Sequence, residues 1–151
     1  MKEPELVVEL NNNWTSIAPV MFIFHNRFQY TPNMASASYK IREYYFRDHP
    51  VSPGTEQRLT DSFSDRFFIH GVHHAIKAHA DYAPVYPYLM TFNDGFSILH
   101  VLEYHDYDPP THADDLPFLF PHPLRPVLTT PAEQDFSKKL VHLWASFATT
   151  G

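Results

Sequence analysis

Proline limits the folding of this chain more than any other residue, because half of its prolines crowd into one short segment. Seven of the 14 prolines lie between Pro109 and Pro131. Proline lacks a backbone N–H and has a fixed φ, so it destabilises helix interiors and central strands. The sequence therefore predicts a loop over this segment, with the regular elements before and after it.

Glycine is scarce, and its spacing excludes several kinds of site. The four glycines are never closer than 17 residues apart. A phosphate-binding loop, a dinucleotide-binding turn and a Gly-x-Ser-x-Gly nucleophile elbow each need glycines only a few residues apart. None of these three motifs can be drawn in the 151 residues.

Charge and composition exclude further classes of function. The chain has 11 Lys and Arg against 17 Asp and Glu, a formal net charge of −6, and no basic run, so nucleic acid is not an expected partner. No stretch approaches the roughly 18 to 20 consecutive apolar residues of a membrane span. The absence of cysteine excludes disulfides, thiolate metal ligands and cysteine nucleophiles. No cofactor is expected.

Two helices are predicted before the proline-rich segment. The apolar residues that fit one face of the first, short helix are Ala37, Ile41, Tyr44 and Tyr45. The second helix is predicted from about Asp65 to Ala80, with Ser64 or Asp65 as its cap. Its expected buried stripe consists of Phe68, Val72, Ala75 or Ile76, and His79.

The pattern then changes to a period of two, which is typical of a strand. The residues on one face are Tyr86, Tyr88, Met90 and Phe92, and they predict a strand over residues 84–92. Asn93-Asp94-Gly95 is a turn signal, and residues 96–102 are predicted as a second strand that pairs with the first as a hairpin.

The final element is predicted from a capping box. Thr130 and Glu133 have the capping-box spacing, and Pro131 occupies the first helical position. The apolar residues that follow at helical spacing are Phe136, Leu140, Leu143, Trp144 and Phe147. Together with the predicted strands, these helices indicate an α/β fold.

One string inside the proline-rich segment carries chemistry: Thr111-His112-Ala113-Asp114-Asp115-Leu116-Pro117-Phe118-Leu119-Phe120. It resembles the segment that carries the catalytic histidine in type-B carboxylesterases, the α/β-hydrolases similar to cholinesterases and to arthropod juvenile-hormone esterases. The family motif runs His-Ala-Asp-Glu/Asp-Leu-x-Tyr/Phe-Leu-Phe. Four further segments match: Asn12 to Pro19 (NNWTSIAP), Ser64 to Phe68 (SDRFF), Pro84 to Tyr88 (PVYPY) and Leu143 to Gly151 (LWASFATTG).

The resemblance implies hydrolysis of carboxylic esters by a Ser-acid-His triad, in which His112 is the general acid and base. It implies that residues 1–151 form a single partial domain, the C-terminal portion of an α/β-hydrolase cut at both ends. The elbow serine, and with it the acid, would lie in an N-terminal portion that also completes the sheet. We therefore expect the chain alone to be inactive. Asp114 and Asp115 are interpreted as a cap or start of a short helix over residues 116–120.

Several alternatives stay open. The chain can also be interpreted as part of an esterase-like adhesion protein without catalysis. A second alternative is a metal-binding module, suggested by the four histidines His70, His73, His74 and His79. The clusters at residues 44–46 and 86–88 are interpreted as core rather than as an acyl pocket. Asn13-Trp14-Thr15 is a possible glycosylation sequon. Relatives are often exported, but residues 1–5 contain no signal core, so no compartment is assigned.

Overall fold

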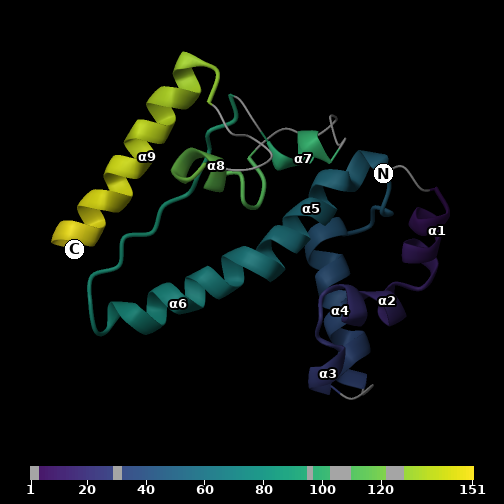
Figure 1. Ribbon diagram of the computed structural model, residues 1–151. Helices are drawn as coiled ribbons and strands as arrows, with labels where there is room; N and C mark the ends of the chain where they lie inside the picture. The colour runs from purple at the N-terminus through teal and green to yellow at the C-terminus, as the bar shows by residue number, and fades with distance from the viewer. Residues whose placement is uncertain (1–3, 29–31, 95–96, 103–109, 122–127) are drawn as a thin grey trace. The chain divides into compact units, whose positions relative to one another are not determined.

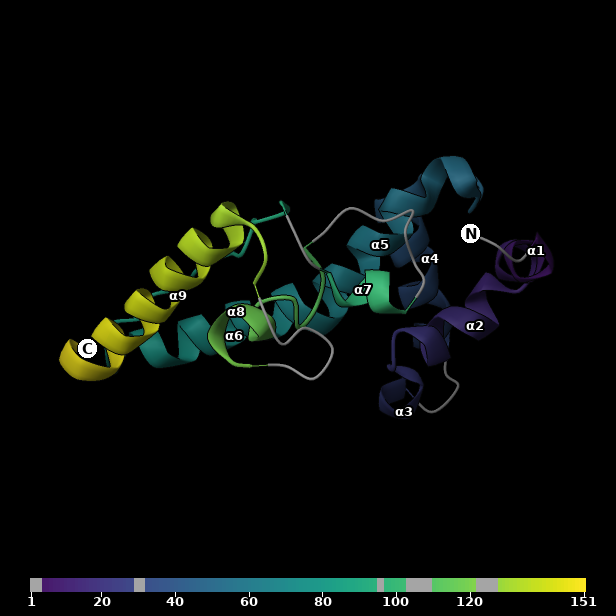
Figure 2. The same ribbon diagram turned by 45° about the horizontal axis from the view of Figure 1, so that its top comes forward.

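The computed structural model describes residues 4–28, 32–94, 97–102, 110–121 and 128–151. The chain divides into two compact units, residues 1–86 and 87–151, which we call the N-terminal and C-terminal units. Figure 1 shows the course of the chain, and Figure 2 shows it from a second direction. Each unit is described by itself.

The described part of the N-terminal unit is helical. Its elements are α1 (Pro4–Asn12), α2 (Trp14–Met21), α3 (His25–Phe28), α4 (Pro32–Phe46), the 3-10 turn η1 (Pro53–Thr55), α5 (Glu56–Ser64), the π-helical turn η2 (Asp65–Ile69) and α6 (His70–Ala80). The predicted helix around residues 37–45 is confirmed as the second half of α4. Its residues Ala37, Ile41 and Tyr45 pack against the core, whereas Tyr44 is 75% exposed, contrary to the predicted face.

Trp14 is at the centre of the core of the N-terminal unit. Its ring makes edge contacts with Phe22 and Phe46, with centroid distances of 6.1 and 5.6 Å. Its indole N–H donates to the backbone oxygen of Ser38 at 2.7 Å. Aromatic edge contacts and a bonded indole N–H make such a ring an effective core anchor. The remaining buried residues of this cluster are Leu10, Ala18, Phe24, Met34 and Val51.

A continuous helical segment runs from α5 through η2 into α6 (Figure 1). The predicted helix end at Ala80 is confirmed, but the predicted start at Asp65 is wrong. Ser64 and Asp65 both have helical backbone angles, because the segment already begins at η1. There the backbone N–H of Ser52 donates to Thr55 Oγ1 at 2.9 Å. Serine and aspartate are common helix caps, but at Ser64 and Asp65 the helix continues without a break.

The predicted buried stripe of this helix is also wrong in this structure. Phe68 is 45% exposed and Val72 is 55% exposed. A helical stripe is buried only where a second layer covers it, and the core of the N-terminal unit lies on the earlier helices instead. Of the aromatic cluster at residues 44–46, Phe46 is fully buried and Tyr45 packs on the core.

The C-terminal unit contains α7 (Ile98–Val101), α8 (Leu116–Leu119) and α9 (Pro131–Thr150). The predicted hairpin is wrong, because residues 98–101 are helical. Residues 84–94 have no strand assignment, and no strand is assigned elsewhere in the described ranges. A strand requires a neighbour that accepts its backbone hydrogen bonds, and alternation of side chains along one segment does not supply that neighbour. Gly95 and Phe96 lie outside the described residues.

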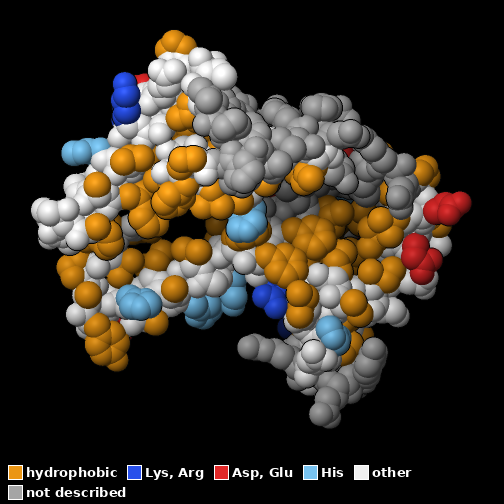
Figure 3. All heavy atoms as spheres, in the orientation of Figure 1, with side chains coloured by type: hydrophobic (Ala, Val, Ile, Leu, Met, Phe, Trp, Pro, Cys, Tyr) orange, Lys and Arg blue, Asp and Glu red, His pale blue; other side chains and the backbone are white. Residues whose placement is uncertain are grey.

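The capping box at the start of α9 is confirmed. Thr130 Oγ1 accepts the backbone N–H of Glu133 at 3.2 Å, and Glu133 Oε2 accepts that of Thr130 at 2.9 Å. The apolar face behind it is covered only in its first half. Leu140 is 5% exposed, whereas Trp144 and Phe147 are 47% and 55% exposed. Figure 3 shows hydrophobic side chains open to solvent over this helix.

None of the helices in the described residues is long and apolar enough to cross a bilayer.

Candidate active site

His112 lies in a tight turn that leads into α8. The backbone N–H of Asp114 donates to the Thr111 oxygen at 3.1 Å, and that of Leu116 donates to the Ala113 oxygen at 3.2 Å. The side chain of His112 is exposed. Two consecutive turn hydrogen bonds fix the backbone on both sides of this residue. The turn therefore presents the imidazole at the surface of the C-terminal unit.

Ala113, the residue after His112, has a left-handed backbone with φ of 72°. This conformation is uncommon for a residue with a Cβ, and it persists only where surrounding contacts enforce it. Residues held in this way concentrate at functional sites. The turn that carries His112 is thus a strained one.

The contacts that enforce this turn come from Asp114, which is 1% exposed. One carboxylate oxygen, Oδ1, accepts the backbone N–H of Ile98 at 2.8 Å. The other, Oδ2, accepts that of Thr111 at 2.8 Å. The predicted short helix is present as α8, but the interpretation of Asp114 as its cap is wrong. Asp115 occupies the N-cap position of α8 but makes no side-chain capping bond.

Sequence reasoning missed this bridge because half of it is non-local. The bond from Asp114 back to Thr111 spans three residues and is typical of local turns made by Asp. The bond to Ile98 spans 16 residues, and no spacing in the sequence indicates it. The Thr111-x-x-Asp114 spacing is the signal from which half of the bridge could have been predicted.

The far side of the turn is fixed by aromatic packing. Phe118 on α8 is 2% exposed, and its ring makes edge contacts with Phe136 and Phe92, with centroid distances of 5.0 and 5.4 Å. The hydroxyl of Ser137 donates to the backbone oxygen of Phe118 at 2.6 Å. The short helix after the His112 turn is therefore attached to α9 by both packing and a hydrogen bond.

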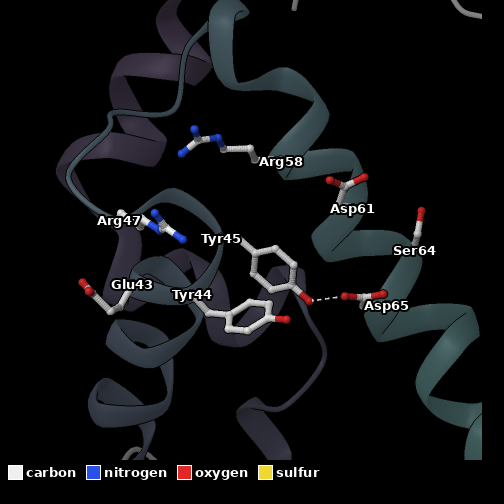
Figure 4. A pocket seen from close by; sticks show the side chains of 8 residues that line it. All are labelled: Glu43, Tyr44, Tyr45, Arg47, Arg58, Asp61, Ser64 and Asp65. Carbon is white, nitrogen blue, oxygen red and sulfur yellow. Dashed lines mark hydrogen bonds between the residues drawn. The ribbon is translucent and has the colours of Figure 1, made fainter.

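A second concave feature lies in the N-terminal unit, between α4 and α5 (Figure 4). It is an open cleft of about 660 Å³ whose wall includes the side chains of Arg47 and Arg58. The Tyr45 hydroxyl points at Asp65 and donates to its Oδ2 at 2.7 Å. Burial, and then this hydrogen bond, raise the pKa of Tyr45 above its ordinary value. Within the cleft, a side-chain hydrogen bond therefore joins α4 to the first residue of η2.

The other sequence-predicted site residues lie in the N-terminal unit. Asn13 is exposed, and its side-chain nitrogen donates to Glu9 Oε1 at 2.8 Å. His70 and His74 are adjacent, with ring centroids 4.4 Å apart. Among the residues that the structure describes, no three His, Asp or Glu side chains are grouped so that they could hold a metal ion.

The sequence model of the carboxylesterase family matches residues 1–151. Curated relatives include esterase E4 of Myzus persicae, 29% identical over 152 residues that cover 95% of this chain and 27% of that protein. Venom carboxylesterase-6 of Apis mellifera is 26% identical, with 97% of this chain and 27% of that protein covered. Esterase-5A of Drosophila persimilis is 24% identical, with 95% and 27% covered. The chain thus spans about a quarter of the length of these relatives. It belongs to the carboxylesterase family.

Proposed function

We propose that this chain is the C-terminal portion of a serine carboxylesterase and that His112 is its general acid and base. Membership of the carboxylesterase family implies an α/β-hydrolase that acts on carboxylic esters. The observation that carries the proposal is the exposed His112 on a turn fixed on both sides, inside the string that resembles the family's histidine segment.

In the proposed reaction, a serine supplied by the N-terminal portion attacks the ester carbonyl carbon. The imidazole of His112 takes the hydroxyl proton during the attack and gives it to the alcohol when the carbon–oxygen bond breaks. A water molecule then attacks the acyl-serine, and His112 takes and returns a proton in the same way, releasing the carboxylic acid. Such a role needs an imidazole that reaches the reacting atoms from a fixed backbone.

The same proposal accounts for the uncovered surfaces within each unit. In the complete domain, residues 84–92 would join the sheet as a strand, and the rest of the domain would cover the apolar faces of α6 and α9. The proposal is supported by the exposed fractions of Val72 on α6 and of Trp144 and Phe147 on α9, which are 55%, 47% and 55%. Large exposed apolar areas commonly mark surfaces that another layer covers. Glycosylation of Asn13 stays a prediction.

A chimera tests the role of His112. The chain replaces the matching segment of the Myzus persicae esterase, whose remaining residues would supply the nucleophile, and hydrolysis of a chromogenic butyrate ester is measured. His112→Ala is expected to lower kcat on the order of 10⁴- to 10⁶-fold, as loss of the histidine does in other serine hydrolases. His142→Ala, at an exposed position on α9, is the matched control and should leave kcat within about twofold of the parent chimera.

The proposal fails if the folded chimera hydrolyses the ester and keeps its kcat in His112→Ala. The 151-residue chain alone supplies the baseline, because its sequence contains no Gly-x-Ser-x-Gly elbow. It should neither hydrolyse the ester nor react with a serine-directed organophosphate above a heat-denatured sample. Labelling of the native chain above that sample would show that the nucleophile lies within these residues.

A further inference from the structure

Asp114 accepts backbone N–H groups from two separate segments, one on each of its carboxylate oxygens. Its Oδ2 holds Thr111, the residue immediately before His112, at 2.8 Å. Its Oδ1 holds Ile98, the first residue of α7, at 2.8 Å. With an exposed fraction of 1%, the carboxylate is protected from water that would compete for these two bonds.

The backbone N–H of Ile98 needs an acceptor from outside its own helix. The first N–H groups of a helix have no acceptor inside the helix. In α7, side chains supply the acceptors. Ile98 N–H donates to Asp114, and Leu99 N–H donates to Ser97 Oγ at 3.2 Å. The start of α7 is therefore built around the same carboxylate that fixes the turn carrying His112.

Between Thr111 and Asp114, next to His112, lies the left-handed Ala113, with φ of 72°. Without an outside constraint, a residue with a Cβ would relax towards a negative φ. Such a rotation at Ala113 would turn the backbone next to it and redirect the His112 side chain. The carboxylate of Asp114 opposes this relaxation. It fixes Thr111 on one side of His112 and Ala113, and on the other side Asp114 is itself fixed by its bond to α7.

We propose that Asp114 is the positioning residue of the His112 turn, holding Ala113 left-handed so that the imidazole points in one direction. This inference rests on the proposed function of His112. Asp114 does not touch the reacting atoms. It acts through His112, by joining the turn to α7.

The test compares Asp114→Asn with Glu133→Ala in the active chimera. Glu133 is the matched control because it is also 1% exposed and also accepts two backbone N–H groups, those of Thr129 and Thr130 at 3.0 and 2.9 Å. Asp114→Asn places an amide donor where one of the two carboxylate oxygens accepted an N–H. Glu133→Ala removes the oxygen Oε2, which accepts both N–H groups at the start of α9.

Asp114→Asn is expected to lower kcat about 100-fold, the size of effect that a misplaced catalytic group can cause, with KM within about twofold. Glu133→Ala should lower the melting temperature comparably and leave kcat within about threefold. Hydrogen exchange followed by mass spectrometry should show lost protection at Ile98 and Thr111 in Asp114→Asn only. These results together support a positioning role rather than a purely structural one.

Three outcomes would overturn the inference. In the first, the two variants lose kcat equally at matched melting temperature. In the second, protection at Ile98 and Thr111 survives in Asp114→Asn. In the third, His112→Ala abolishes hydrolysis while Asp114→Asn does not change kcat. If His112→Ala itself leaves hydrolysis intact, the proposed function fails and takes this inference with it, so the two failures are distinguishable.

Discussion

Asn11 connects three segments of the N-terminal unit, and its removal gives the sharpest test of how that unit is held together. Its Oδ1 accepts the backbone N–H of Val51 at 2.9 Å and a guanidinium N–H of Arg42 at 3.0 Å. Its Nδ2 donates to the backbone oxygens of Val51 and Val7 at 2.8 and 2.9 Å. One side chain on α1 thus fixes α4 and the chain that follows α4.

The expected cost of Asn11→Ala follows from these contacts. Val51 is 1% exposed, so its N–H and its carbonyl would both lose their partner away from water, at about 1.5 kcal/mol each. The Arg42 bond adds about 1 kcal/mol, and the better helix propensity of alanine returns about 0.6 kcal/mol. The free energy of unfolding should therefore fall by about 3 to 4 kcal/mol.

Asn12→Ala is the matched control, because Asn12 is the next residue on α1 and is exposed. It shares the gain in helix propensity but not the contacts, so its effect should stay within about 0.5 kcal/mol. Unfolding in urea is followed by tryptophan fluorescence in a Trp144→Phe background, where the buried Trp14 reports on the N-terminal unit alone. With an m-value of about 1 kcal/mol/M, the midpoint should fall by about 3 M.

A loss below about 1 kcal/mol in Asn11→Ala, or a loss equal to that in Asn12→Ala, would refute this reasoning. Either result would mean that the backbone of Val51 finds other partners when the side chain is removed. The hydrogen bonds of Asn11 would then contribute little to the packing of α1.

Two further predictions concern aromatic residues. Phe118→Ala should destabilise the C-terminal unit by about 3 to 4 kcal/mol, measured from the urea dependence of amide exchange in α9. Phe120→Ala, at a 62% exposed side chain, should cost under about 0.5 kcal/mol. Equal losses in the two variants would contradict the assigned packing. Because the folded pKa of Tyr45 is raised, its contribution is complete below about pH 10 and is lost at higher pH. The urea midpoint should therefore fall more between pH 9 and 11 in the wild type than in Tyr45→Phe. Tyr39→Phe, at a 63% exposed side chain, should show the same fall of the midpoint with pH as the wild type. An equal fall in Tyr45→Phe and the wild type would refute the raised pKa of Tyr45.

Local signals in the sequence were sufficient where the deciding contacts are themselves local. The capping box of Thr130 and Glu133 was predictable because both partners lie within one turn of the helix start. The end of α6 at Ala80 was also predicted, and the turn that ends it is local, since the backbone N–H groups of Tyr82 and Ala83 both donate to the oxygen of His79. The start of α5 was missed because Ser52 and Thr55 make their contact in a 3-10 turn, without the acidic residue that identifies a capping box.

Period and polarity failed where burial depends on another layer. Tyr86, Tyr88, Met90 and Phe92 alternate as in a strand, yet no strand is assigned there. Val72 fits a helical stripe and is still 55% exposed. In both cases the pattern shows that one face of the segment is suited to burial. That face is buried only when another strand or layer packs against it.

Only the neighbours of His112 in the chain distinguish it from the other histidines, because they form a string of ten residues that resembles a family motif. The family assignment is confirmed over residues 1–151, whereas the catalytic role of His112 stays a proposal. The sequence also excluded a nucleophile elbow within these residues, because glycine spacing is a property of the chain alone.

The bridge through Asp114 was decided by the folded structure. Its carboxylate accepts an amide 16 residues away, and whether two such groups meet depends on how the chain returns between them. The order of residues determines short-range contacts, because neighbours along the chain are always close in space. Contacts between distant residues arise only when packing brings the segments together, so the left-handed turn beside His112 and its anchor on α7 became visible only in three dimensions.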